Sequence, residues 1–227
     1  MEDLKIAGYG KSNGGNFNKI SITGYGEILD NVFCKTLNGS GSAKFNGTLA
    51  ASDMKYSGDI TVSGYCQVKN VEVSGKITIN NDAKLNNVDC SGNFSILGNL
   101  KFDNIFVNGD FTSYKNVTGE NIKLYGDIVI KNELCAEDVT IKSSSVEINE
   151  LHANNVVIKK PFTINFLKKG VYVDEIECTT IDAENLKCKK LCAHDIKLSK
   201  KCEIDVIEYS GTLDLENGCV VKEIIKL

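Results

Sequence analysis

The sequence has very few of the residues that interrupt β-structure or that build catalytic and metal sites. Among 227 residues there are one proline, Pro161, no tryptophan and two histidines. No run approaches the roughly 18 apolar residues of a membrane-spanning helix. The stretch from Met1 to Ala7 lacks the basic start and apolar core of a secretion signal. We therefore expect a cytoplasmic protein.

An excess of charge of one sign is also missing. The chain carries 26 basic and 30 acidic residues, which gives a net charge of −4. Like charges form no block long enough for an interaction tail. Proteins that bind nucleic acid usually show a basic patch or stripe, so the sequence predicts no nucleic-acid partner.

Apolar residues recur instead with a period of 17. The stretch from Gly58 to Ser74 holds three apolar pairs, each with one residue between its members, and Gly75 starts the pattern again. These pairs are Ile60 and Val62, Cys66 and Val68, and Val71 and Val73. One such unit cannot bury its apolar side alone, but copies stacked on one another form a β-solenoid.

The corners between the pairs repeat with the same period. Glycine, asparagine and aspartate tolerate the tight-turn conformations that corners need, and stacked asparagine side chains can hydrogen-bond along the stack. One line of corners is Gly24, Gly41, Gly58, Gly75, Gly92, Gly109 and Gly126. Another is Asp53, Asn70, Asn87, Asn104, Asn121, Asp138 and Asn155.

The residue between the two apolar members of each pair is mostly polar. This alternation is typical of a strand with one buried face. Three strands and three corners per turn predict an all-β fold, a triangular parallel β-helix with about a dozen coils of mostly 17 residues. The pattern leaves its handedness open. Left-handed hexapeptide solenoids have coils of three strict hexads, whereas the steps here are six, five and six.

The repeat divides the chain into segments. Residues 1–15 are rich in glycine, serine and asparagine, and we expect a flexible N-terminal arm there. Residues 16–227 are expected to form a single continuous solenoid. Within it, residues 16–158 form regular coils, 159–170 an irregular loop, and 171–227 coils that are narrower at first and then regular again.

The irregular loop holds Pro161 and four large apolar residues between lysine pairs. The simplest interpretation is one more strand pair followed by a bulging loop. The alternative is a short amphipathic lip that contacts an anionic membrane or a protein partner. The residues expected to make that contact are Phe162, Phe166 and Leu167.

No pattern of catalytic or metal-ligating residues emerges. Alternation turns His152 and His194 toward solvent on different coils, and a pair of Cys192 and His194 lacks further ligands for a metal. Seven of the nine cysteines occupy inward positions, where a thiol behaves as a small apolar group. Those seven are Cys34, Cys66, Cys90, Cys178, Cys188, Cys202 and Cys219. The sequence predicts reduced thiols, no cofactor, no metal and no enzyme activity.

Three segments resemble a known family. They are the opening Gly10 to Ile20, coils such as Val71 to Gly75, and Cys202 to Tyr209 near the end. The sequence resembles the bactofilins, and more closely the long, two-segment, bactofilin-related polymer-forming cytoskeletal proteins of Bacillus- and Clostridium-like bacteria. The resemblance implies a right-handed β-helix that assembles end to end without nucleotide as a cytoplasmic scaffold, in some members peripherally associated with a membrane.

The expected function is therefore a structural scaffold whose main partner is a second copy of itself. Its end coils would join through backbone pairing and apolar contacts. The residues expected at this interface are Phe17, Ile20, Ile22, Val221, Ile224 and Ile225. The alternative is a binding scaffold that does not polymerise and uses a flat face or the 162–167 loop for a membrane surface or another scaffold protein.

Overall fold

A computed structural model describes residues 1–161 and 170–227 of the chain. Within these ranges the protein is all strand, turn and connection, and it contains no helix that is long and apolar enough to cross a membrane. Over the described residues the fold is a parallel β-solenoid in each part of the chain, as the repeat predicted. The chain divides into two compact units, Met1–Lys115 (unit 1) and Asn116–Leu227 (unit 2).

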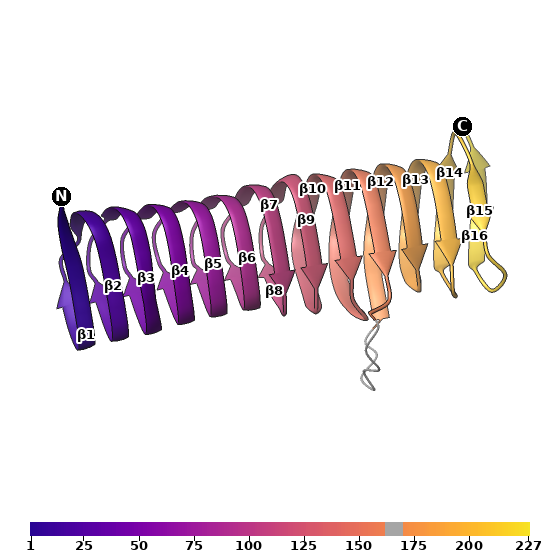
Figure 1. Cartoon of the computed structure of the whole chain (residues 1–227). Helices are drawn as coiled ribbons and strands as arrows, with labels where there is room; N and C mark the ends of the chain where they lie inside the picture. Colours follow the sequence, from indigo (N-terminus) through magenta and orange to yellow (C-terminus); the bar gives the residue numbers. More distant parts are fainter. Residues whose placement is uncertain (162–169) are drawn as a thin grey trace. The chain divides into compact units, whose positions relative to one another are not determined.

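Unit 1 consists of strands that each pair in parallel with the next coil, shown from indigo to magenta in Figure 1. The offset from one coil to the next equals the period of the sequence repeat over most of the unit, so Val71 lies between Met54 and Val88. This register is the predicted one. The strands are β1 (Glu2–Ser12), β2 (Gly15–Ile28), β3 (Val32–Phe45), β4 (Leu49–Val62), β5 (Cys66–Ile79), β6 (Ala83–Ile96), β7 (Leu100–Asn108) and β8 (Phe111–Ser113).

Unit 2 is a second stack of parallel strands, in which the coil length changes. Leu134 pairs with Leu151, one full period further along the chain, whereas Ile176 pairs with Leu191 after a shorter coil. The predicted shortening after the 159–170 segment is confirmed. The strands are β9 (Val117–Tyr125), β10 (Asp127–Lys142), β11 (Ser145–Lys159), β12 (Gly170–Glu184), β13 (Leu186–Ser199), β14 (Glu203–Tyr209), β15 (Leu213–Leu215) and β16 (Val220–Lys226).

The prediction of a flexible arm over residues 1–15 was wrong. Residues 2–12 form β1, which pairs in parallel with β2 and places Leu4 beside Ile20 and Ile6 beside Ile22. Leu4 and Ile6 have the spacing of an inward pair. The glycines that follow them were interpreted as a linker, but glycine is equally suited to the corner between two strands. That the solenoid is continuous over 16–227 stays a prediction.

The strands bury alternate side chains, as the spacing of the apolar pairs predicts. On β5, Val71 and Val73 are 3% and 1% exposed, whereas Glu72 between them faces solvent. The inward side chains of successive coils lie directly above one another because the offset keeps the alternation in phase. The core of each unit is therefore a stack of apolar pairs along its coils.

The glycine corners are required by the close approach of successive coils. Gly75 has φ of +134°, a backbone conformation that side chains other than glycine rarely adopt. A Cβ atom placed on Gly75 would lie 2.4 Å from the carbonyl oxygen of Gly58 in the preceding coil. A second coil can therefore stack here only because the corner has no side chain.

The asparagine corners form the predicted hydrogen-bond ladder. In unit 1, Asn70 Nδ2 donates to Asp53 Oδ1 at 2.8 Å, and Asn87 Nδ2 donates to Asn70 Oδ1 at 3.1 Å. In unit 2, Asn155 Nδ2 donates to Asp138 Oδ1 at 2.8 Å. Each amide thus donates to the coil before it, so the ladder helps to fix the register of the stack.

One inward position of unit 1 departs from the pattern of aliphatic residues. Gly39 leaves a gap in the core, and the ring of Tyr56 fills it: a Cβ atom on Gly39 would lie 2.6 Å from the Tyr56 Cε2 atom. Tyr56 is 2% exposed, and its buried hydroxyl has no hydrogen-bond partner among the described residues. Burial also raises the pKa of Tyr56 to about 12.

Replacing Tyr56 with phenylalanine is expected to stabilise the protein by roughly 1–2 kcal/mol. The change keeps the ring that fills the gap at Gly39 and removes the desolvation cost of an unpaired hydroxyl. Urea unfolding followed by circular dichroism measures the effect. The matched control is Tyr65→Phe, at an exposed tyrosine, which should leave stability unchanged. A loss of stability in Tyr56→Phe would show that the hydroxyl makes a favourable interaction.

Candidate functional site

The C-terminal coil of unit 2, formed by β15 and β16, leaves one edge open. Strand β16 pairs with β14 along one side, which places Val221 beside Ile204 and Ile224 beside Ile207. Within the described part of the chain, no strand pairs with the other side of β16. Its outward-directed backbone N–H and C=O groups are therefore available to another strand.

The inward side chains of this coil are apolar and accessible to solvent. Ile207, one coil deeper, is 0% exposed, whereas Ile224 above it is 49% exposed. We call the open set the C-terminal rung. It consists of Leu213, Leu215, Cys219, Val221 and Ile224, of which the first four are half-buried. Burying such side chains would stabilise a complex because it removes apolar surface from water.

The structure places two of the three predicted C-terminal interface residues on this rung. Val221 and Ile224 continue the inward lines of Ile204 and Ile207. Ile225 does not: it lies beside Glu208, between inward positions, and alternation turns it away from the core. The expectation that Ile225 belongs to the apolar end surface was therefore wrong.

The N-terminal edge of unit 1 differs more from the prediction. Ile20 and Ile22 are both 0% exposed because β1 covers them. Phe17 is half-buried, and Glu2 lies beside it. The expectation that Ile20 and Ile22 form the end of the stack was therefore wrong.

The first coil supplies the open edge of unit 1 instead. We call its inward positions the N-terminal rung: Leu4, Ile6, Gly10, Ser12, Gly15 and Phe17. A sequence signal was present, because Gly8 precedes Gly24 by nearly one period and has the positive φ, +82°, of the glycine corners. Beside the rung, the exposed ring of Tyr9 stacks on Tyr25 with centroids 5.1 Å apart.

The faces of the coils carry charges that pair from one coil to the next. Lys187 Nζ lies 2.8 Å from a Glu203 oxygen, and Lys222 Nζ lies 2.7 Å from a carboxylate oxygen of Asp205. The hydrogen bond that Lys187 donates to the Glu203 carboxylate raises the pKa of Lys187. Exposed pairs of this kind contribute little to stability, but they give the faces mixed charge.

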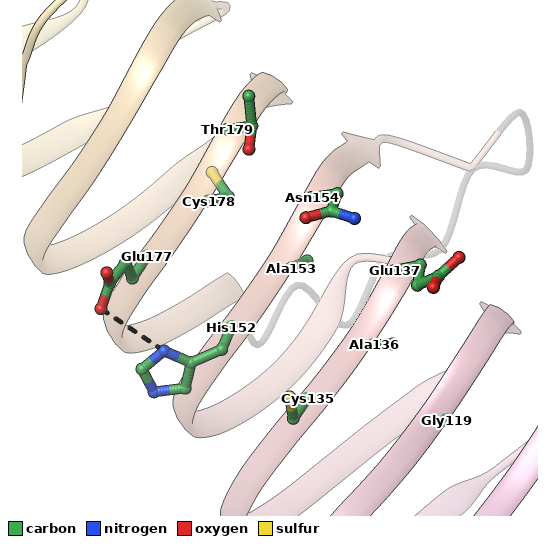
Figure 2. Close-up of a pocket in the computed structure, with 10 residues that line it drawn as sticks. All are labelled: Gly119, Cys135, Ala136, Glu137, His152, Ala153, Asn154, Glu177, Cys178 and Thr179. Carbon is green, nitrogen blue, oxygen red and sulfur yellow. Dashed lines mark ion pairs between the residues drawn. The ribbon is translucent and has the colours of Figure 1, made fainter.

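A shallow pocket of about 510 Å³ lies on one face of unit 2. Figure 2 shows its lining, with His152 at the rim and Cys135 and Cys178 on the strands to either side. The register explains the grouping, because Cys135, His152 and Glu177 are direct neighbours on β10, β11 and β12.

His152 has carboxylate neighbours that sequence reasoning missed. Its Nδ1 lies 3.6 Å from a Glu177 oxygen, the contact dashed in Figure 2. Its Nε2 lies 3.8 Å from Glu150 and 3.9 Å from Glu133. These separations are too long for hydrogen bonds, so the ring is surrounded by negative charge without being held in one orientation.

One thiol that lines the pocket, that of Cys178, is not activated. Burial raises the pKa of the Cys178 thiol to about 12, whereas an attacking thiol needs a lowered pKa. Over the described ranges, no group of three or more His, Cys, Asp or Glu side chains is arranged to hold a metal ion. The second histidine, His194, is exposed, and its Nδ1 lies 2.8 Å from Ser210 Oγ.

The third group of predicted residues lies outside the described part of the chain. Phe162, Phe166 and Leu167 fall between residues 161 and 170. The proposed membrane or partner contact of this loop therefore stays a prediction.

Comparison with known proteins finds no match among protein-family models, curated proteins or solved structures. The functional argument therefore depends on the geometry of the chain. The most distinctive feature of that geometry is the set of apolar inward residues that the last coil of unit 2 leaves accessible to solvent, whereas Ile6 in the first coil of unit 1 is only 7% exposed.

Proposed function

We propose that this chain is a structural protein that assembles end to end with copies of itself, as the bactofilin-related proteins that it resembles are expected to do. The observation that carries the proposal is the C-terminal rung. Its inward apolar residues occupy positions that are buried in the coil beneath, and Ile224 is nevertheless 49% exposed.

Two physical terms favour the joining of such edges. An added strand would satisfy the free backbone groups along β16, which is the interaction used in β-strand addition. An added coil would also bury the C-terminal rung, because each coil of a solenoid is stabilised mainly by its neighbours. Neither term requires a nucleotide, a metal or another cofactor.

The state of the cysteines supports a cytoplasmic location for this scaffold. All nine are free thiols, and unpaired thiols are typical of a reducing compartment. Burial raises the pKa of Cys66 and Cys188 to about 12, which makes these two thiols slow to react.

Replacing Ile224 with arginine is expected to reduce the assembled fraction at least tenfold. The charged side chain can reach solvent in the separate molecule, but an added coil would bury its charge without a partner. Sedimentation of the purified protein over a range of concentrations, without nucleotide, measures the assembled fraction. The control is Thr118→Arg, at an exposed position of β9.

The control variant should assemble like the parent protein, and both variants should keep the circular dichroism signal of β-structure. Undiminished assembly of Ile224→Arg would remove the C-terminal rung from the interface.

A specific observation also favours the alternative, a binding scaffold that does not polymerise. A hollow of about 400 Å³ lies on one face of unit 1, with Phe33 and the small residues Ala50 and Ala51 in its lining. Phe33 is 49% exposed, and an exposed aromatic side chain beside small residues suits a protein partner. A protein that remains monomeric at every concentration would favour this alternative.

A further inference from the structure

Cys219 in the C-terminal coil of unit 2 and Cys202 in the coil beneath it occupy the same inward position. Glu203 and Val220, the residues that follow them, are paired strand neighbours. The Val220 N–H donates to the Cys202 carbonyl oxygen at 2.8 Å. Neighbouring strands lie about 4.8 Å apart, which falls within the separation of Cα atoms, roughly 4.4–6.8 Å, at which a disulfide can form.

The two thiols point into the same part of the core. The Cys202 Sγ donates to the Ser199 carbonyl oxygen at 3.2 Å, and the Cys219 Sγ donates to the adjacent Leu198 carbonyl oxygen at 3.5 Å. Burial raises the pKa of the Cys202 thiol to about 11, and the charge and a hydrogen bond of the Cys219 thiol add to this rise. An interaction of that kind requires the two sulfur atoms to be close to each other.

No other two inward cysteines lie directly beside each other in neighbouring coils of the described residues. Cys192 lies beside Glu177 and therefore one residue out of register with Cys178, so alternation turns one of these two thiols inward and the other outward. Cys188 lies beside Ile204. The pair in the last two coils is therefore a particular feature of this end of unit 2.

The two thiols of the pair differ in their access to solvent. Cys202 is 0% exposed, and a buried thiol with a raised pKa is slow to react by itself. Cys219 is half-buried and follows the exposed corner residues 216–218. A small oxidant dissolved in water can therefore reach Cys219 but not Cys202.

We infer that Cys202 and Cys219 form an oxidation site, at which a peroxide converts the two thiols to a disulfide that locks the C-terminal coil onto the coil beneath it. The inference does not depend on the proposed end-to-end assembly. In a reducing compartment the pair stays reduced, as it is in this structure, and the disulfide forms when the peroxide concentration rises.

The reaction proceeds in two steps. The Cys219 thiolate attacks one oxygen of hydrogen peroxide, the O–O bond breaks, and Cys219 becomes a sulfenic acid while the other oxygen leaves as water. The Cys202 sulfur then attacks the Cys219 sulfur. The S–S bond forms, the S–O bond breaks, and the Cys202 proton leaves with the hydroxide as a second water. The two thiols together lose two electrons and two protons, and the peroxide is reduced to two waters.

The disulfide would act on the least supported coil of unit 2. Strand β16 pairs with β14 along one side, and a coil held on one side can open locally. A cross-link between the two coils restricts the opened state and therefore makes opening rarer. The corner before Cys219 has room to adjust, because a Cβ atom on Gly218 would meet no atom within 4 Å.

Peptide mass mapping of the full chain after treatment with hydrogen peroxide tests the site. Trypsin cleaves after lysine, so both cysteines fall in one peptide, residues 202–222. We expect this peptide to lose about 2 Da, the mass of two hydrogens, to resist alkylation, and to recover when dithiothreitol is added. Added oxygen without an internal disulfide, a link to another cysteine, or an unreacted peptide would each overturn the inference.

Two variants separate the roles of the cysteines. In Cys202→Ala the sulfenic acid at Cys219 has no partner, so dimedone should label the peptide instead of a disulfide forming. The matched control is Cys192→Ser, at another half-buried cysteine, and it should form the disulfide as the parent protein does. A disulfide that is lost in Cys192→Ser would contradict the assignment of the pair.

Hydrogen exchange of the parent protein tests the locking and needs no variant. Oxidation should slow the exchange of β16 amides by at least about tenfold, because these amides exchange through opening of the last coil. The amides of β5, in unit 1, should exchange at the same rate in both states. Equal rates for β16 in the reduced and oxidised protein would show that the disulfide does not lock the coil.

Discussion

Replacing Gly75 with alanine is expected to destabilise the protein by about 2–5 kcal/mol. The positive φ of Gly75 costs an alanine roughly 1–2 kcal/mol. The 2.4 Å approach of its Cβ atom to the Gly58 carbonyl oxygen forces the coils apart, and overpacking of this kind costs roughly 1–3 kcal/mol. The effect is large because the atom in contact is backbone, which cannot move aside as a side chain can.

Urea unfolding at one protein concentration measures this loss. Lys76→Ala is the matched control, because Lys76 is the next residue, is exposed and shares the corner. It should change stability by less than about 0.5 kcal/mol. Equal effects in the two variants would mean that the coils are not in close contact at the glycine corner.

Replacing Phe94 with alanine is expected to cost about 3–5 kcal/mol, the usual range for removing a buried phenylalanine. Phe94 is 1% exposed and Phe111, in the next coil, is 0% exposed. Their rings pack edge to face with centroids 5.4 Å apart. The substitution therefore removes apolar burial and an aromatic contact between coils.

The comparison for this variant is Tyr114→Ala, in which the truncated aromatic side chain is 50% exposed. It removes a side chain of similar size from unit 1 and should cost far less than Phe94→Ala. The urea unfolding midpoints of the two variants, measured under identical conditions, give the two losses of stability to be compared. Similar losses would contradict a core formed by stacked inward residues.

The regular coils were predictable because one physical constraint repeats in the sequence. The period of the apolar pairs predicted that Val71 lies beside Val88, and the period of the corners predicted the hydrogen bond between Asn70 and Asn87. Stacked parallel coils need the same alternation in each turn. A wrong register would therefore turn apolar residues toward solvent in many coils at once.

The departures from prediction arise where the repeat changes length. Strand β1 pairs with β2 at an offset that differs from the period, and its glycine-rich composition is also that of a linker, so neither period nor composition identified it. His152 meets Glu133 and Glu177 across coils of different length. Those contacts also depend on side-chain rotamers, which a pattern of residues does not specify.

The end surfaces were only partly predictable for a related reason. Val221 and Ile224 follow from the inward alternation, but Ile225 shares their apolar character and lies on the opposite side of β16. Ile20 and Ile22 were expected at an end because the preceding segment was interpreted as unstructured. Once β1 is recognised as a coil, the same rule assigns Leu4 and Ile6 to that edge.

Electron microscopy of the purified full chain without nucleotide tests the central claim, end-to-end assembly, most directly. We expect thin filaments of uniform width that lengthen as the protein concentration rises and shorten when Ile224→Arg protein is added to block their ends. Single particles of uniform size at every salt and protein concentration would contradict the account.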